Sequence, residues 1–314
     1  MRKNLITGLW MFAGLLLSLA APSTALCADI EFEGTFENRK LDDAKWYLKQ
    51  IHQPVIQQDI VRSGTNALML TGKPEFPCSP SRPSDNCMRN QIRLAHKYRI
   101  LAGTPAWYGF SLRVEGEVPR QGSIRTILAE WKEQGGASPF AALRYDNGVF
   151  HLSVQDSRCR SLVTMGWEQA EAITATTASA DIKPNCRDRL KIEAAQPLPN
   201  PYGNWVDLAV FIKRDLVDGI VEVWADGNFI GRVTGPIGND AKTRCGESRR
   251  CLARTDPTQY FKAGIYADIC TIIRSENTDE DVRFCRDGDM MVYLDNIRRG
   301  NNRSEVDPAL LDPR

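Results

Sequence analysis

The stretch Tyr260-Phe261-Lys262-Ala263-Gly264-Ile265-Tyr266 decides how the rest of the chain is interpreted. In a β-strand, successive side chains point to opposite faces of the sheet. Phe261, Ala263 and Ile265 then share an apolar face, which predicts burial in a core. The opposite face carries two phenols, a cation and a glycine: Tyr260, Lys262, Gly264 and Tyr266. Gly264 predicts room for a ligand beside the backbone, although an exposed face with tyrosines chosen for β-propensity explains this strand equally well.

Short segments with the same alternation, separated by turn signals, occupy the chain on both sides of this stretch. The expected strands are 30–36, 67–71, 91–99, 107–114, 124–132, 140–145, 149–154, 205–213, 220–225, 228–234 and 291–298. The sequences Asp146-Asn147-Gly148 and Asp226-Gly227 predict tight hairpin turns. No linker or long helical pattern interrupts these strands, so residues 29–300 are expected to form one all-β domain, a sandwich or jelly roll of two antiparallel sheets. The polar residues 301–314 are expected to form a mobile tail.

The N-terminus has the features of a bacterial export signal. Arg2 and Lys3 precede an apolar run over residues 5–21, and small residues follow it up to Ala28. This pattern predicts that residues 1–28 are a signal peptide, which is removed, and that the protein is periplasmic or secreted. A membrane anchor is the alternative, but the run is short and no second apolar run follows it.

The net charge does not indicate nucleic-acid binding, and the cysteine content favours disulfides over zinc sites. The formal net charge is +1, so no overall field marks a nucleic-acid-binding protein. Cleavage after Ala28 removes Cys27 from the nine cysteines and leaves eight. These fall in pairs that are close in sequence: Cys78 with Cys87, Cys159 with Cys186, Cys245 with Cys251, and Cys270 with Cys285. Pairing of neighbours is the simplest of many connectivities, and it fits an oxidising compartment better than zinc binding, since the chain lacks Cys-x-x-Cys.

Two further segments carry polar side chains along one face of a predicted strand: Arg89, Gln91 and Arg93 in the first, and Glu130 and Lys132 in the second. If these faces join that of Tyr266 on one concave sheet, the surface is cationic and rich in hydrogen-bond donors. Such a surface suits an anionic sugar polymer, because Arg binds carboxylates through two N–H groups at once. Ordinary solvated faces with salt bridges explain any one of these strands, but explain three at once less well.

The sequence over 260–266 resembles the Tyr-Phe-Lys-x-Gly-x-Tyr signature of the jelly-roll polysaccharide lyases, the group of alginate lyases, heparin lyase I and glucuronan lyases. Residues 89–93 lie where that group has Arg-x-Glu-x-Arg, and residues 130–132 lie where many members have Gln-x-His. The resemblance covers most of the chain after the signal, including 107–111, 207–213, 221–227 and 293–297. It implies a concanavalin-like β-jelly roll.

The chain departs from the family pattern at three positions: the acid is replaced by Gln91, the glutamine by Glu130 and the histidine by Lys132. The resemblance implies β-elimination at a uronic acid, in which the C5 proton is removed and the C4 oxygen leaves. Tyr266 is then expected to be the base and acid, while Gln91 and Arg93 hold the carboxylate. Lys262 and Arg93 are expected to stabilise the phenolate, and Lys132 to add positive charge or to bind a sugar.

Substrate binding is assigned to the remaining polar residues near the three strands: Arg89, Glu130, Tyr260, His96 and His151. An isolated histidine is more often structural than catalytic. The resemblance implies no cofactor for catalysis and allows a structural calcium, for which Glu31, Glu33 and Asp295 are candidate ligands. Ordinary surface acids are the alternative explanation of those three residues. The expected partner is an acidic polysaccharide (glucuronan, alginate or a heparin-like chain), with no nucleic acid, no membrane after signal cleavage, and a monomeric protein.

Two other functions fit parts of the pattern. A glycoside hydrolase requires two carboxyl groups about 5–10 Å apart across the scissile bond, and Glu130 is the only acid on the three proposed site strands. A protein that binds an acidic polysaccharide without cutting it needs only the cationic surface, and Lys132 in place of histidine is compatible with that function.

Overall fold

The computed structural model describes residues 30–47, 52–75, 87–116, 125–133, 138–146, 149–156, 161–165, 189–193, 196–239, 258–274, 281–286 and 288–313. The predicted signal peptide, residues 1–28, lies outside these ranges, as do the predicted disulfide partners Cys78, Cys159, Cys186, Cys245 and Cys251. No helix in the described ranges is long and apolar enough to cross a membrane.

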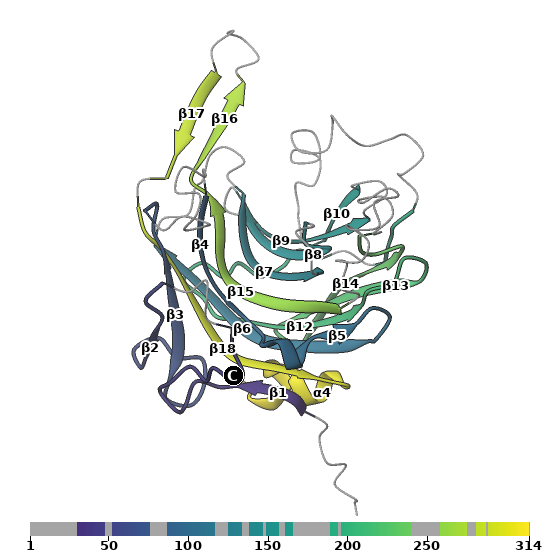
Figure 1. Cartoon of the computed structure of the whole chain (residues 1–314), viewed down its shortest axis with the longest axis horizontal. Helices are drawn as coiled ribbons and strands as arrows, with labels where there is room; N and C mark the ends of the chain where they lie inside the picture. The colour runs from purple at the N-terminus through teal and green to yellow at the C-terminus, as the bar shows by residue number, and fades with distance from the viewer. Residues whose placement is uncertain are drawn as a thin grey trace, which may run out of the picture.

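The larger of two antiparallel sheets contains nine strands. In spatial order they are β11 (Lys191–Glu193), β14 (Asn228–Gly235), β13 (Gly219–Ala225), β12 (Val206–Lys213), β6 (Ala106–Gly116), β18 (Met290–Gly300), β3 (Ala67–Gly72) and β2 (Val55–Gln57), with β1 (Ile30–Gly34) also paired to β18. This sheet forms the lower layer in Figure 1.

The second sheet contains seven strands and curves above the first (Figure 1). Its order is β10 (Ser161–Met165), β9 (Val149–Asp156), β8 (Ala141–Asp146), β7 (Thr126–Glu133), β15 (Thr258–Asp268) and β4 (Cys87–Arg93), with β5 (Ile100–Leu101) also paired to β15. The key strand β15 therefore lies between β4 and β7. The two antiparallel sheets confirm the predicted all-β jelly-roll sandwich.

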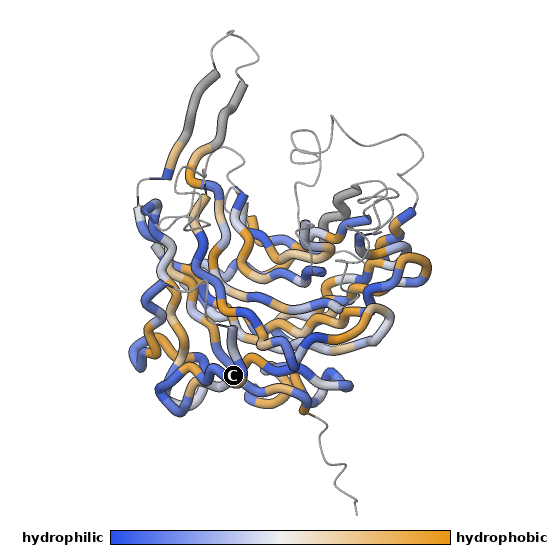
Figure 2. Tube along the Cα trace, viewed as in Figure 1, coloured by the Kyte–Doolittle hydropathy of each residue, from blue (hydrophilic) through white to orange (hydrophobic). Residues whose placement is uncertain are grey.

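Period-2 alternation produces the core between the two layers. Phe261 on β15 and Trp131 on β7 point toward the larger sheet, with their ring centroids 5.2 Å apart. Tyr108 on β6 packs against both rings from the opposite layer, at 5.5 Å and 5.7 Å. Burial of each large apolar side chain contributes about 1.5–3 kcal/mol. Figure 2 shows the resulting alternation of hydrophobic and hydrophilic residues along the strands.

Both predicted hairpins are present. Asp226 (φ 48°) and Gly227 (φ 78°) connect β13 to β14, and two successive positive φ angles are typical of a type I′ turn. Strands β8 and β9 pair up to Asp146 and Val149, which are register partners. The Asp226–Gly227 turn fixes the register of β13 and β14.

The structure differs from the sequence prediction in several places, and it contains six strands that were not predicted: β2, β5, β10, β11, β16 (Cys270–Arg274) and β17 (Asp281–Cys285). The expected strand 91–99 ends at Arg93, and the chain continues into a short 3₁₀ helix, η1 (His96–Tyr98). The expected mobile tail instead forms α4 (Arg303–Val306) and α5 (Pro308–Leu311), which pack under the larger sheet (Figure 1). This packing requires Gly109 on β6, since a Cβ there would lie 1.8 Å from the carbonyl oxygen of Val306.

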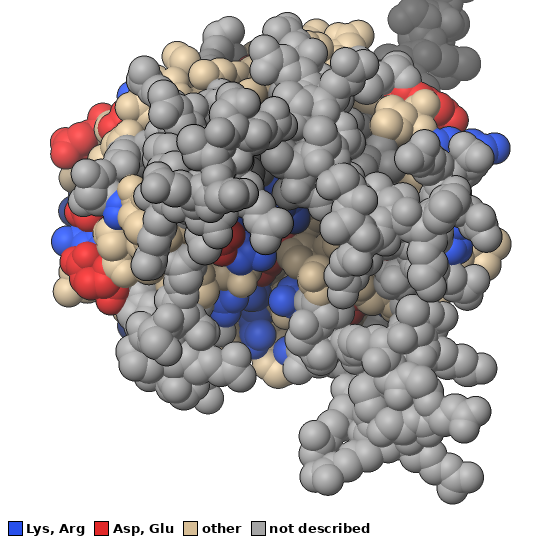
Figure 3. All heavy atoms as spheres, turned by 90° about the horizontal axis from the view of Figure 1, so that it is seen from above, with Lys and Arg blue, Asp and Glu red and all other residues tan. Residues whose placement is uncertain are grey.

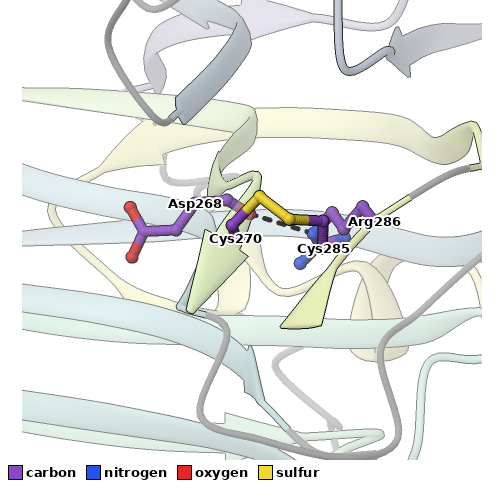
Figure 4. Close-up of a disulfide and its surroundings, with 4 residues drawn as sticks. All are labelled: Asp268, Cys270, Cys285 and Arg286. Atoms are coloured by element: carbon purple, nitrogen blue, oxygen red, sulfur yellow. Dashed lines mark hydrogen bonds between the residues drawn. A yellow bond between two sulfur atoms is a disulfide. The ribbon is translucent and has the colours of Figure 1, made fainter. Parts of the chain in front are cut away.

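A disulfide closes the hairpin of β16 (Cys270–Arg274) and β17 (Asp281–Cys285), which projects above the second sheet (Figures 1 and 4). The bond joins Cys270 to Cys285 and confirms that predicted pairing. Beside it, Arg286 Nε donates to the carbonyl oxygen of Asp268 at 3.1 Å, and Arg286 Nη2 donates to Thr126 Oγ1. Arg286 therefore ties the end of β15 to the start of β7.

His151 on β9 is buried, with 3% of its surface exposed. Burial lowers the pKa of His151 to about 3, and the nearby charge of Arg144 acts in the same direction. Its ordinary value in an unfolded chain is near 6.5. Between these two pKa values the unfolded chain binds a proton that the folded chain does not, so His151 makes the protein less stable as the pH falls below 6.5.

We therefore expect His151→Gln to reduce the acid sensitivity of the fold. Between pH 7 and pH 5 the free energy of unfolding of the wild type should fall about 2 kcal/mol more than that of the variant. Urea titrations of both proteins at the two pH values measure this difference, and all other titrating groups are common to both. Parallel losses of stability would show that His151 is not held neutral by the fold.

Candidate active site

The three polar strand faces lie side by side in the second sheet. On one side of β15, Tyr266 pairs with Arg89, Gly264 with Gln91, and Lys262 with Arg93. On the other side, Lys262 pairs with Glu130 and Tyr260 with Lys132. Seen from above, Lys and Arg atoms gather in a hollow of the molecule (Figure 3). The sheet thus forms a groove whose floor is cationic.

Tyr266 lies between two guanidinium groups. The Cζ atom of Arg89 is 4.3 Å from the centroid of the Tyr266 ring, and that of Arg125 is 4.8 Å away. Arg125 Nη2 also donates to the phenol oxygen at 3.3 Å and is held by Asp268 at 2.6 Å. Because a guanidinium can only donate, the phenol keeps its own proton for another acceptor. Negative charge on the phenol oxygen would be stabilised by both cations.

Arg125 belongs to none of the motifs in the sequence, and sequence reasoning missed it. It directly precedes β7, two positions before Ile127, which is the register partner of Tyr266. A register shift between β15 and β7 at this point sets that pairing. Register shifts of this kind depend on contacts that are distant in sequence, so no local pattern indicated Arg125.

Gln91 is buried on β4 opposite Gly264, one register pair along from the pair of Arg89 with Tyr266 on the same strand face. It is 1% exposed, and in the described part of the chain neither its amide nitrogen nor its amide oxygen has a hydrogen-bond partner. A buried amide without partners costs about 1–3 kcal/mol, so such groups usually await a ligand or water. Gln91 lies on the same strand face as Arg89 and Arg93, where a ligand in the groove would meet it.

Glu130 forms an ion pair with Lys262, whose Nζ atom lies 3.1 Å from Glu130 Oε1. Burial lowers the pKa of Lys262 to about 8, although Glu130 acts to raise it. Burial also lowers the pKa of Lys132, with Glu130 opposing this shift and Arg89 and Arg125 adding to it. The Glu130 carboxylate is thus held in a buried ion pair with Lys262.

Gly264 has a different role from the one its sequence position suggested. Its φ angle is 121°, and it lies at the register shift between β15 and β7. A Cβ added to Gly264 would lie 2.4 Å from the carbonyl oxygen of Asn90 and 2.7 Å from Leu70 Cδ1. The glycine therefore permits a bulge and close packing against β4, and the space beside it is not an opening for a ligand.

The remaining predicted site residues do not all lie next to Tyr266. Arg93 lies beside His96 at 3.3 Å, and its guanidinium stacks on Tyr260 at 5.1 Å from the ring centroid. The cations in contact with Tyr266 are thus Arg89 and Arg125, rather than the expected Lys262 and Arg93. His151 is on β9, three strands from β15 in the sheet order.

The three candidate calcium ligands do not form a shared site. Glu31 pairs with Arg299 at 2.8 Å, and Glu33 pairs with Arg298 at 2.9 Å. Asp295 accepts hydrogen bonds from three backbone N–H groups instead. In the described part of the chain, no group of three or more His, Cys, Asp or Glu side chains is placed to hold a metal. These carboxylates do not fit the oxygen cage that calcium requires.

Comparison with known proteins identifies the family and the fold. The sequence profile of the family described as "Polysaccharide lyase" matches residues 35–306. No curated protein matches the chain. Among solved structures, the endo-β-1,4-glucuronan lyase of the fungus Trichoderma reesei superposes with a TM-score of 0.54 at 16% identity, covering 89% of this chain and 98% of that one.

A complex of the family 7 alginate lyase A1-II′ is also similar, with a TM-score of 0.42, 13% identity, and coverage of 76% of this chain and 80% of that one. The glucuronan lyase supports the fold of the whole domain. The family profile spans both sheets, including β4, β7 and β15 with the groove residues described above. The chain therefore belongs to the polysaccharide lyase family.

Proposed function

We propose that this lyase cleaves a polysaccharide containing uronic acid by β-elimination, with Tyr266 as base and acid. One observation carries the proposal. The buried amide of Gln91, which has no partner, lies on a strand face between Arg89 and Arg93, and no carboxylate in the described ranges forms an ion pair with either guanidinium. A uronate carboxylate supplies the acceptor oxygens and the negative charge that this arrangement lacks.

The elimination has two electrostatic requirements. Removal of the C5 proton places negative charge on the adjacent carboxyl group, so this group must be neutralised by nearby donors. Gln91 and Arg89 are placed to do this, because both lie on β4 directly opposite Gly264 and Tyr266. The sequence motif assigned this task to Gln91 and Arg93, but Arg89 is the guanidinium that borders Tyr266.

Tyr266 accounts for the proton transfers. Its phenolate takes the C5 proton, the C5–H electrons form the C4–C5 double bond, and the C4–O bond breaks. The departing oxygen then receives a proton from the phenol. Arg125 donates to the phenol oxygen, so it holds the ring in place and stabilises the charged form. Lys132 and Lys262 add positive charge to the groove.

The class of substrate follows from the charge of the groove. Glucuronan and alginate appear in the names of the similar structures, and both are chains of uronic acids. A cationic floor selects for such polymers and against neutral ones. The carboxylates on the three site strands are each paired with a cation, Glu130 with Lys262, Glu133 with Arg214 and Asp268 with Arg125, which disfavours a hydrolase that needs two free carboxyl groups.

We expect Tyr266→Phe to lower kcat for the formation of unsaturated, ultraviolet-absorbing chain ends by at least about 100-fold, because it removes the only proton that the phenol can exchange. Absorbance of new double bonds from glucuronan and from alginate measures this rate, and binding of the same polymers should persist. Tyr202→Phe is the matched control, since Tyr202 is exposed and donates to the carbonyl oxygen of Gly116 away from the groove.

Three outcomes separate the candidate functions. New double bonds lost only in Tyr266→Phe support elimination through this residue. Reducing ends that form without new double bonds indicate a hydrolase instead, and binding without any cleavage by the wild type indicates a binding protein. Unchanged product formation by Tyr266→Phe removes Tyr266 from the mechanism.

We also propose that the mature protein is exported, to the periplasm or beyond. The Cys270–Cys285 disulfide supports this proposal, because disulfides persist mainly in oxidising compartments. The intact mass of protein recovered from the periplasm or medium of a bacterial host should correspond to a chain without residues 1–28. Recovery of the full-length chain from the cytosol alone would contradict the proposal.

A further inference from the structure

A buried guanidinium, that of Arg286, lies at the base of the β16–β17 hairpin, next to the ion pair of Arg125 with Asp268. We propose that Arg286 is a positioning residue for the reaction at Tyr266, which acts through Asp268 and Arg125 without touching the substrate. This inference rests on the proposed function, and it extends the machinery of the elimination to a residue outside the three site strands.

One nitrogen of Arg125 contacts both Asp268 and Tyr266. Nη2 donates to Asp268 Oδ1 at 2.6 Å and to the phenol oxygen of Tyr266 at 3.3 Å. This nitrogen carries two N–H groups in the fixed plane of the guanidinium, so the N–H group that Asp268 holds sets the direction of the other. Burial acts to lower the pKa of Arg125, but Tyr266 and Asp268 together raise it above its usual value. Arg125 therefore keeps its charge beside the phenol.

The ion pair needs support from the backbone to keep this direction. The side chains of Arg125 and Asp268 are 37% and 29% exposed, and an ion pair that is open to water holds its own geometry only weakly. The direction of the second N–H group therefore depends on how the two chain segments are fixed. One link is direct, since Asp268 N donates to the carbonyl oxygen of Arg125 at 2.9 Å.

Arg286 joins the same two segments through its side chain. Its Nε donates to the carbonyl oxygen of Asp268 at 3.1 Å, and its Nη2 donates to Oγ1 of Thr126, the residue after Arg125. Figure 4 shows the first of these bonds beside the disulfide. Water competes little for them, because Arg286 is 4% exposed and Thr126 is fully buried. One planar set of donors thus fixes the chain on both sides of the ion pair.

The hairpin holds Arg286 in this place. Arg286 directly follows Cys285, which forms the disulfide with Cys270, and Cys270 is two positions after Asp268. In addition, Arg286 N donates to the carbonyl oxygen of Ile269 at 2.8 Å. The backbone of Arg286 is therefore tied to the end of β15 by a covalent bond and by a hydrogen bond, so its side chain extends from a fixed point.

The test compares two substitutions of Arg286. Arg286→Met keeps the length of the side chain and removes its donors, whereas Arg286→Lys keeps the charge and loses the planar set of donors. Each is made alone and together with Arg125→Gln. Arg299→Met is the matched control, because Arg299 is 5% exposed and donates to the carbonyl oxygen of Tyr98 from β18 in the other sheet. Formation of ultraviolet-absorbing ends from glucuronan and alginate gives kcat and KM, and thermal melting followed by circular dichroism checks folding.

We expect Arg286→Met to lower kcat about 10- to 100-fold and to change KM less than about threefold, because displacement of Arg125 is felt mainly in the transition state. Arg286→Lys should lower kcat by a smaller factor. When Arg125→Gln is already present, Arg286→Met should lower kcat further by less than about threefold, since residues that act as one unit are not additive. Arg299→Met should leave kcat unchanged, even where it lowers the melting temperature.

A second measurement is independent of catalysis. The Nε–H group of Arg125 gives an NMR signal, which is assigned by its loss in Arg125→Gln. In the wild type its order parameter should be about 0.85, as for a rigid group, and in Arg286→Met it should fall below about 0.6. Arg299→Met should leave this order parameter unchanged.

The outcomes distinguish this inference from the proposed function. If the wild type cleaves neither polymer but Arg125 loses its order in Arg286→Met, the proposed elimination fails and the positioning of Arg125 by Arg286 stands. If Arg125 stays rigid in Arg286→Met, the inference is overturned. An equal loss of kcat with and without Arg125→Gln also overturns it, because Arg286 would then act on the fold as a whole. Where Arg286→Met does not fold, Arg286→Lys decides by the same two comparisons.

Discussion

Clustered positive charge that carboxylates compensate only in part is the constraint on which the rest of this structure depends. Arg125 pairs with Asp268 and Lys262 with Glu130, whereas Arg89 and Arg93 form no ion pair with a carboxylate in the described ranges. Arg89, Arg125 and Lys132 share one part of the groove, while Arg93 and Arg99 share another. Like charges at such separations repel each other, and partial burial removes water that would screen them. The protein tolerates this repulsion because the apolar side chains on the opposite face of the same strands are buried in the core, and their burial stabilises the fold.

Strand β15 shows how one segment meets both demands. Phe261, Ala263 and Ile265 are buried between the layers, and Lys262 and Tyr266 lie on the groove side of the same backbone. Alternation thus couples the aromatic core to the cationic floor. At its end, Asp268 holds Arg125, and Arg286 beside the Cys270–Cys285 disulfide holds the backbone of Asp268. The position of Tyr266 relative to Arg125 therefore depends on the base of this hairpin, where Figure 4 shows the disulfide and the hydrogen bond between Arg286 and Asp268.

Local patterns were sufficient to predict which strand faces carry chemistry, because side-chain alternation requires no knowledge of distant contacts. They also predicted the tight turn at Asp226–Gly227, the pairing of β8 with β9, and the Cys270–Cys285 pair. Local patterns could not predict the register, that is, which residues of neighbouring strands lie opposite each other. Whether Arg89 or Arg93 borders Tyr266 depends on how β4 aligns with β15, and the contact with Arg125 depends on a register shift against β7. The C-terminal helices pack against β6 because Gly109 leaves room for Val306, a contact between positions distant in sequence.

The central claim is that carboxylates of the polymer provide the negative charge that the groove lacks. The most direct measurement is the affinity of Tyr266→Phe for a hexasaccharide of β-1,4-linked glucuronate and for the same hexasaccharide after reduction of its carboxyl groups to alcohols. The account predicts at least about 100-fold weaker binding of the reduced sugar, since several charged hydrogen bonds are lost at once, and weaker binding of the acidic sugar as salt is added. Equal affinity for the two sugars would contradict it.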